Sequence, residues 1–157
     1  MGRKYSISFS GVAATAAQDA FEVLVPADKV MVLHELHLSQ STEVGDAEAE
    51  MVQASIRRVT GAPTSGSGGS TATPLPLDEG DSAAGITAEI NNTTQLSGGT
   101  NVVLHKEEWH VAAGLHYVPT PDARPVFRGQ TRCLVEYEAA PADSTTFSGT
   151  MIVEEIG

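Results

Sequence analysis

The chain has 157 residues, of which 41% are hydrophobic and only 18% are charged. It carries 20 acidic and 9 basic side chains, so its formal net charge is −11 at pH 7. A chain this acidic repels a phosphate backbone, and its basic residues are scattered apart from adjacent Arg57 and Arg58, which argues against nucleic acid as a partner. The charge suits solubility, or docking on a surface with basic patches.

Alternation of apolar and polar residues with period two predicts strands along most of the chain. In the first of them, Tyr5, Ile7 and Phe9 alternate with serines, and we expect one face of this strand to be buried. The predicted strands are residues 5–10, 21–25, 29–40, 51–59, 85–92, 101–110, 115–118, 131–138 and 145–156.

The long strand 29–40 illustrates how the alternation assigns faces. A regular strand places residues i and i+2 on the same side. We therefore expect one face to carry Val30, Val32, His34, Leu36 and Leu38, and the other to carry Met31, Leu33, Glu35 and His37.

The segments between the strands set the domain organisation. Residues 60–82 are rich in Gly, Ser and Pro and predict an extended surface loop. A linker between two domains is the alternative, but neither half has enough strands to bury a core of its own. Residues 1–4 are expected to form an N-terminal arm. Residues 12–20 and 46–53 could form a helical turn or two, and little helix is expected elsewhere.

The fold class that follows is all-β. We expect a single antiparallel β-sandwich or jelly roll of about eight or nine strands, formed by one domain that spans residues 1–157. The start of the chain lacks the apolar stretch of a signal peptide, and no segment approaches the roughly 20 apolar residues of a membrane span. A cytoplasmic origin, or release by lysis, and the absence of a membrane partner are therefore expected.

Histidines and acidic residues offer no motif with the spacing of a metal site. His34 and His37 are three residues apart, which sends them to opposite faces of a regular strand, and His105, His110 and His116 are spread over two predicted strands. The acidic stretches 43–50 and 78–81 lack the ligand spacing of known calcium loops. We expect no bound metal and no cofactor.

No pattern of catalytic residues is present either. The only cysteine, Cys133, lies in an apolar run that predicts a buried structural thiol. A Gly-x-Ser-x-Gly elbow is absent, and residues 65–69 lack the lysine of a phosphate-binding loop. The neighbouring carboxylates at 107–108 and 154–155 would point to opposite faces of a strand. The expectation is a protein that is not an enzyme.

Aromatic residues are few. Trp109, with Tyr117 nearby, is the one candidate for an exposed sugar-binding platform, although aromatic residues in a sandwich usually pack in the core. Core positions are therefore the preferred interpretation for both.

The order of these features along nearly the whole chain resembles small structural proteins of tailed bacteriophages. The resemblance rests on the serine-alternating residues 5–10, residues 26–29 before a long strand, the Gly/Ser loop 66–71 before residues 74–78, and the ending 148–157. It implies a jelly-roll head decoration (cement) protein that binds the major capsid protein as a homotrimer on the capsid surface, having been made in the host cytoplasm.

Two other function classes stay open. One is a jelly-roll module of a tail or fibre that recognises host glycans, which requires exposed aromatic residues around Trp109. The other is a cupin-like enzyme, which requires a metal bound through His34 or His37. For the decoration protein, the residues expected to contact the partner are Arg3, Lys4, Tyr5 and Trp109, because the short basic N-terminus could add to a neighbouring strand edge.

Overall fold

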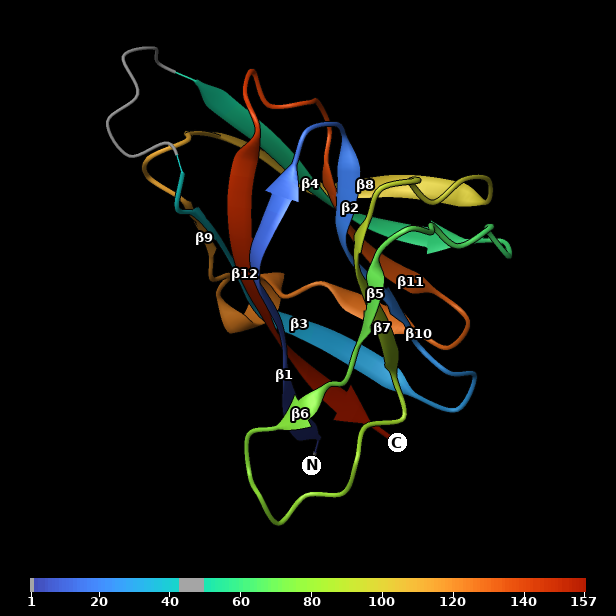
Figure 1. The fold of residues 1–157 in the computed structure, drawn as a ribbon. Helices are drawn as coiled ribbons and strands as arrows, with labels where there is room; N and C mark the ends of the chain where they lie inside the picture. The colour runs from blue at the N-terminus through green and yellow to red at the C-terminus, as the bar shows by residue number, and fades with distance from the viewer. Residues whose placement is uncertain (1, 43–49) are drawn as a thin grey trace.

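The computed structural model describes residues 2–42 and 50–157, and within them the chain is almost entirely β-structure (Figure 1). One short 3₁₀ turn, η1 (Pro121–Ala123), is the exception to this pattern. The strands are β1 (Arg3–Ala14), β2 (Gln18–Leu24), β3 (Val30–Gln40), β4 (Met51–Thr60), β5 (Ser70–Ala72), β6 (Leu75–Pro76), β7 (Thr87–Asn92), β8 (Thr100–His110), β9 (Leu115–Tyr117), β10 (Val126–Arg128), β11 (Arg132–Tyr137) and β12 (Thr145–Ile156).

The strands form two antiparallel sheets, which confirms the predicted all-β sandwich. Sheet A has the order β10-β3-β12-β1-β6, with β9 also paired to β3, and sheet B has the order β5-β7-β2-β11-β4-β8. Early strands pair with late strands in reverse order: β1 with β12, β2 with β11, β3 with β9 and β10, and β4 with β8. Both sheets therefore draw strands from both sides of residues 60–82.

The core lies between the two sheets and is fixed by the alternation seen in the sequence. Tyr5, Ile7 and Phe9 of β1 are buried, whereas the serines between them face outward. The Phe9 ring lies 5.1 Å from the ring of Phe21 in the opposite sheet, and tilted aromatic pairs of this kind stabilise a core beyond simple burial.

A β-bulge in β3 changes the predicted assignment of faces. Ile152 of β12 pairs with Glu35 and Val153 pairs with Leu33, so His34 is an extra residue without a partner in β12. Because one extra residue reverses the alternation, the buried positions are Met31 and Leu33 before the bulge and Leu36 and Leu38 after it. The expectation that Leu36 and Leu38 share the face of Val30 and Val32 was wrong.

Three strands lie where the sequence predicts none. The segment 60–82, expected to be an extended loop, contains β5, which pairs with β7, and β6, which pairs with β1. The strand β10 follows η1 and pairs with the start of β3. Each has two or three residues, and alternation cannot be recognised in so short a run.

The expected arm and helical turns also differ from the structure. Arg3 and Lys4 belong to β1 and pair with Glu155 and Glu154 of β12, so the chain is already a strand where an arm was predicted. Residues 12–20 enter β1 and β2 and form no helical turn. For the turn predicted at 46–53, residues 46–49 lie outside the described residues, and β4 begins at Met51. Among the described residues, no helix is long and apolar enough to cross a membrane.

Candidate functional site

The cysteine is buried in this fold, and each of the five histidines has a hydrogen-bond partner within the chain. Cys133 is fully buried, and burial raises the pKa of its thiol far above the ordinary value, so the thiol stays protonated. Within residues 2–42 and 50–157, no group of three or more His, Cys, Asp or Glu side chains could hold a metal ion. Most of the acidic stretch 43–50 lies outside the described residues.

Two of the four predicted contact residues lie in the core. Tyr5 is fully buried, with its hydroxyl donating to the carbonyl of Ser82 at 3.0 Å. Trp109 is only 6% exposed. Neither ring can meet a partner or a sugar, because each is already covered by the protein's own core. Their assignment as contacts was wrong, and the core position expected as the usual alternative for Trp109 is what the structure has.

The other two predicted residues, Arg3 and Lys4, lie at the end of the sandwich where both chain termini are found (Figure 1). The side chain of Arg3 already has partners within the chain, since its guanidinium lies 3.5 Å from Asp81 and donates to the Ser82 hydroxyl at 2.8 Å. Lys4 is exposed and has no ion pair among the described residues. Lys4 is therefore the predicted cation that remains available to a partner.

Ligand-binding pockets usually measure about 300–1,000 Å³, and a pocket of about 720 Å³ lies beside Lys4. The bulged residue His34 lines it, with Nε2 2.8 Å from a carboxylate oxygen of Glu154. Leu77, 56% exposed, stands at its rim, and Leu75 of β6 is 61% exposed on the same sheet edge. The pocket thus combines apolar surface with charged groups, as protein-binding surfaces do.

Strand register extends this surface across the outer face of sheet A. Lys4 pairs with Glu154, Glu154 with Val32, and Val32 with Val126, so these four residues form one row. Arg128, Val30 and Ile156 form the next row, two positions along. Val126 and Ile156 are exposed. We call these two rows (Lys4, Val30, Val32, Val126, Arg128, Glu154 and Ile156) the β10–β1 face.

A basic pocket adjoins the β10–β1 face. Arg58 and Arg128 line it together with Val126 and Thr131. Arg58 is held in place because it donates to the carbonyl of Val126 at 3.0 Å and lies 5.7 Å from the centre of the Phe127 ring. Among the described residues, neither arginine has an acidic partner. Two unpaired guanidinium groups in so acidic a chain favour a carboxylate or another anion as ligand.

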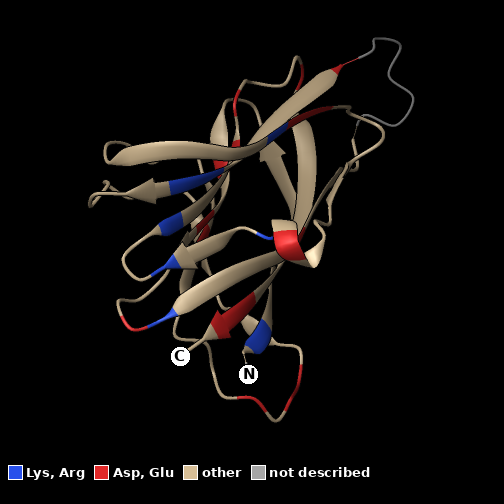
Figure 2. Cartoon of the chain, turned by 180° about the vertical axis from the view of Figure 1, so that it is seen from behind, with Lys and Arg blue, Asp and Glu red and all other residues tan. Residues whose placement is uncertain are grey.

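This pocket is not apparent from the sequence, because its two arginines are far apart in the chain. Figure 2 shows Lys and Arg on several neighbouring strands along one side of the molecule. Arg128 of β10 and Arg58 of β4 line one pocket although their strands belong to different sheets. The expectation that basic residues stay scattered was wrong for this pair. No local signal could have revealed it, because β10 has only three residues.

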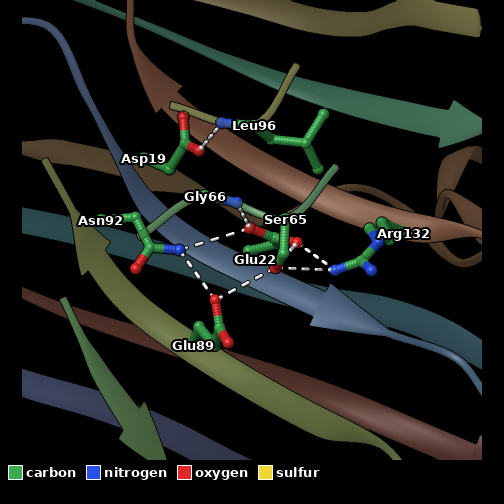
Figure 3. A network of polar contacts seen from close by, with 8 residues as sticks. All are labelled: Asp19, Glu22, Ser65, Gly66, Glu89, Asn92, Leu96 and Arg132. Atoms are coloured by element: carbon green, nitrogen blue, oxygen red, sulfur yellow. Dashed lines mark hydrogen bonds and ion pairs between the residues drawn. The ribbon is translucent and has the colours of Figure 1, made fainter. Parts of the chain in front are cut away.

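On the outer face of sheet B, a buried polar network holds two loops in place (Figure 3). Glu22 of β2 is buried and accepts hydrogen bonds from the Ser65 hydroxyl at 2.7 Å and from the Gly66 amide at 3.0 Å. Arg132 of β11 forms an ion pair with the same carboxylate, and Asn92 donates to both Glu22 and Glu89. Because a buried carboxylate needs such partners, this network serves to fix the loop at 61–69.

A second loop is anchored by Asp19, which lies on the same outer face. One oxygen of its carboxylate accepts from the Leu96 amide at 2.7 Å, while the other is buried without a partner among the described residues. Burial, with the nearby Glu136 and Glu22 carboxylates, raises the pKa of Asp19 to about 7. Paired backbone bridges join this loop to the first one at Thr64–Ser97 and Ser67–Thr94.

Comparison with known proteins gives no relative from which a role could be transferred. No protein-family model matches the chain, and neither a curated protein nor a solved structure matches it significantly. The function has to be argued from the fold and the surfaces described above.

Proposed function

We propose that this chain is a non-enzymatic virion structural protein, a decoration (cement) protein that binds the major capsid protein on the head surface of a tailed phage. The observation that carries the proposal is the strand order. Pairing of β1 with β12, β2 with β11, β3 with β9 and β10, and β4 with β8 describes a long antiparallel hairpin rolled into two sheets. This pairing supports a jelly roll, an architecture that occurs in viral capsid proteins, lectins and cupins.

The surfaces favour a structural role among the proteins with this architecture. A lectin-like module would need an exposed aromatic platform, and Trp109 is buried. A cupin-like enzyme would need a metal held by His34 or His37 together with further protein ligands. His34 is bonded to Glu154, and among the described residues no group of three or more His, Cys, Asp or Glu side chains could hold a metal ion. A protein that braces a shell needs instead a rigid body and one docking surface. The β10–β1 face is the candidate for that docking surface.

Docking through the β10–β1 face follows from its mixture of groups. Burial of Val126 and Ile156 would supply the apolar contribution, at about 25 cal/mol per Å² of surface removed from water. Lys4 and Arg128 lack acidic partners among the described residues, so carboxylates of the capsid protein can pair with them. Such charge pairs select the partner and its orientation more than they add affinity. The proposed assembly on the shell is a homotrimer.

Co-sedimentation with heads tests the proposed function. The purified chain is mixed with mature, empty heads of its own phage and, separately, with unassembled major capsid protein. We expect saturable binding to heads and none to the unassembled subunit. Absence of binding to heads, or equal binding to both, would contradict the proposal.

A matched pair of variants tests the docking surface. Arg128→Glu reverses an exposed charge within the β10–β1 face, whereas Lys106→Glu makes the same charge change on β8 of sheet B, where Lys106 pairs with Glu138 of the same sheet. Circular dichroism shows that both variants are folded before binding is compared. We expect Arg128→Glu to weaken head binding at least tenfold, about the effect of losing a close interfacial charge pair, and Lys106→Glu to leave it within twofold. Equal effects of the two variants would argue for another contact surface.

A further inference from the structure

Two imidazoles from neighbouring strands of sheet A lie next to each other, at the end of β3 that is away from the β10–β1 face. His37 of β3 and His116 of β9 are directly paired in the strand register. Their Nδ1 atoms are 2.9 Å apart, and the ring centres are 5.1 Å apart in an edge-to-face arrangement. The bulge at His34 is what brings His37 to this outward-facing side.

The hydrogen bonds of His37 determine what the gap between the two rings can hold. Its Nε2 lies 3.1 Å from a carboxylate oxygen of Glu35. When Nε2 donates its proton to that carboxylate, Nδ1 carries a lone pair and accepts from the Nδ1–H of His116. A single proton then lies between two nitrogen lone pairs. A carboxylate on the far nitrogen is also the usual partner of a metal-binding histidine.

The surroundings leave the gap open to solvent. The register row containing the pair continues from His37 to Thr150 and then to Ser8. These residues line a shallow hollow of about 550 Å³ with further hydroxyl side chains. His116 is exposed, and no lysine or arginine lines the hollow. An ion and its waters can therefore reach the Nδ1 atoms.

We propose that His37 and His116 bind one late first-row divalent transition ion, such as Zn²⁺, Ni²⁺ or Cu²⁺, through their Nδ1 atoms. The ion takes the place of the shared proton, which moves by way of solvent to Nε2 of His116, so that both rings stay neutral, and water fills the remaining positions. Two Zn–N bonds of about 2.0–2.1 Å at a tetrahedral angle place the nitrogens about 3.3 Å apart. The present separation of 2.9 Å therefore needs only a small widening, which the exposed ring of His116 can supply.

The ligand set and the overall charge favour these ions over others. Imidazole nitrogens suit zinc, copper and nickel, whereas Mg²⁺ and Ca²⁺ prefer oxygen ligands. The net charge of −11 raises the local concentration of every cation, so discrimination between the two classes has to come from the imidazoles. Glu35 acts as a positioning residue, because it fixes the tautomer and orientation of His37.

Bound metal would tie β9 to β3. The strand β9 has only three residues and forms part of the sheet edge, so a metal bridge between His116 and His37 adds a link where the backbone pairing is short. This inference does not depend on the proposed function.

Isothermal titration of the untagged chain with ZnCl₂ tests the site, with NiCl₂ as a second probe and MgCl₂ as the negative probe. We expect one Zn²⁺ per chain, a higher melting temperature with the ion than without it, and no comparable response to Mg²⁺. His37→Asn and His116→Asn should each lower the affinity at least tenfold, and Glu35→Gln should lower it by a smaller factor without changing the melting temperature of the metal-free protein.

His105 provides a matched control. Its Nε2 lies 3.0 Å from Glu107, which repeats the arrangement of His37 and Glu35, but it packs against the Tyr117 ring and has no second imidazole. His105→Asn should leave Zn²⁺ affinity within about twofold of the unaltered chain. The proposal is wrong if Zn²⁺ does not bind, if His105→Asn weakens binding as much as His116→Asn, or if Mg²⁺ binds equally well.

Discussion

Asp19 of β2 lies directly opposite Glu136 of β11, and the two carboxyl groups share the covered outer face of sheet B. Burial raises the pKa of both groups, and for Asp19 it reaches about 7. Two carboxylates so placed, with Glu22 as a third nearby, repel one another when ionised. The fold is therefore most stable when Asp19 carries a proton, although the Leu96 amide by itself favours the ionised carboxylate.

This arrangement predicts a stability that falls with rising pH. The ordinary pKa of Asp19 is 3.8, so between that value and about 7 the folded protein holds a proton that the unfolded chain has released. The stabilisation is complete below pH 3.8 and is lost as the pH rises through about 7. Asp19→Asn stays neutral at every pH, so we expect it to raise the free energy of unfolding by about 1–4 kcal/mol at pH 8 and to give no gain near pH 4.

Urea unfolding of the two proteins at several pH values measures this difference. Asp122→Asn, at an exposed position in η1, serves as the control and should have no pH-dependent effect. A gain from Asp19→Asn that is equal at both ends of the pH range would show that Asp19 does not titrate as described.

The ion pair of Arg132 with buried Glu22 predicts a large effect of removing the cation. Arg132→Met leaves the carboxylate buried with only neutral donors, which should cost about 2–4 kcal/mol of unfolding free energy. Adding Glu22→Gln to Arg132→Met should recover part of that loss, because the uncompensated charge is gone. Chemical denaturation of the single and double variants measures both values, and additive losses would count against the pair.

A variant of Tyr5 tests whether this residue acts in the core or in contact with a partner. Tyr5→Phe removes the hydroxyl that donates to Ser82 but keeps the buried ring. We expect a loss of about 0.5–1.5 kcal/mol in stability and unchanged affinity for heads. Thermal unfolding and co-sedimentation of the same preparation measure the two quantities. If head binding fell while stability stayed the same, the original assignment of Tyr5 as a contact would be right after all.

The homotrimer predicts a native mass in solution three times that of the 16.4 kDa chain. Light scattering at micromolar concentration measures it directly. A trimer would support the decoration role. A monomer would count against a preformed trimer and would require that the chains associate only on the shell.

The sequence predicted the long strands well because their apolar residues alternate in step with burial. In β1, Tyr5, Ile7 and Phe9 are core residues as the pattern indicates. The prediction of faces failed in β3, where one unpaired residue, His34, reverses the alternation. A bulge of this kind depends on the partner strand, so the residues of β3 alone do not reveal it.

The candidate surfaces were much less predictable. Lys4 was identified from the basic N-terminus, but Arg58 and Arg128 meet only because β10 and β4 lie at the same side of the sandwich. The pairing of His37 with His116 likewise needs the bulge in β3 and the short strand β9. These are long-range consequences of strand order, whereas alternation reports only which face of one strand is buried.

Cryo-electron microscopy of mature heads incubated with the purified chain tests the central claim most directly, since it shows both whether the protein binds and how it is oriented. The account predicts density for the protein at regular positions on the shell, with the β10–β1 face, including Lys4, Val126 and Arg128, turned toward the capsid protein. Undecorated heads, or a protein bound through the outer face of sheet B, would contradict it.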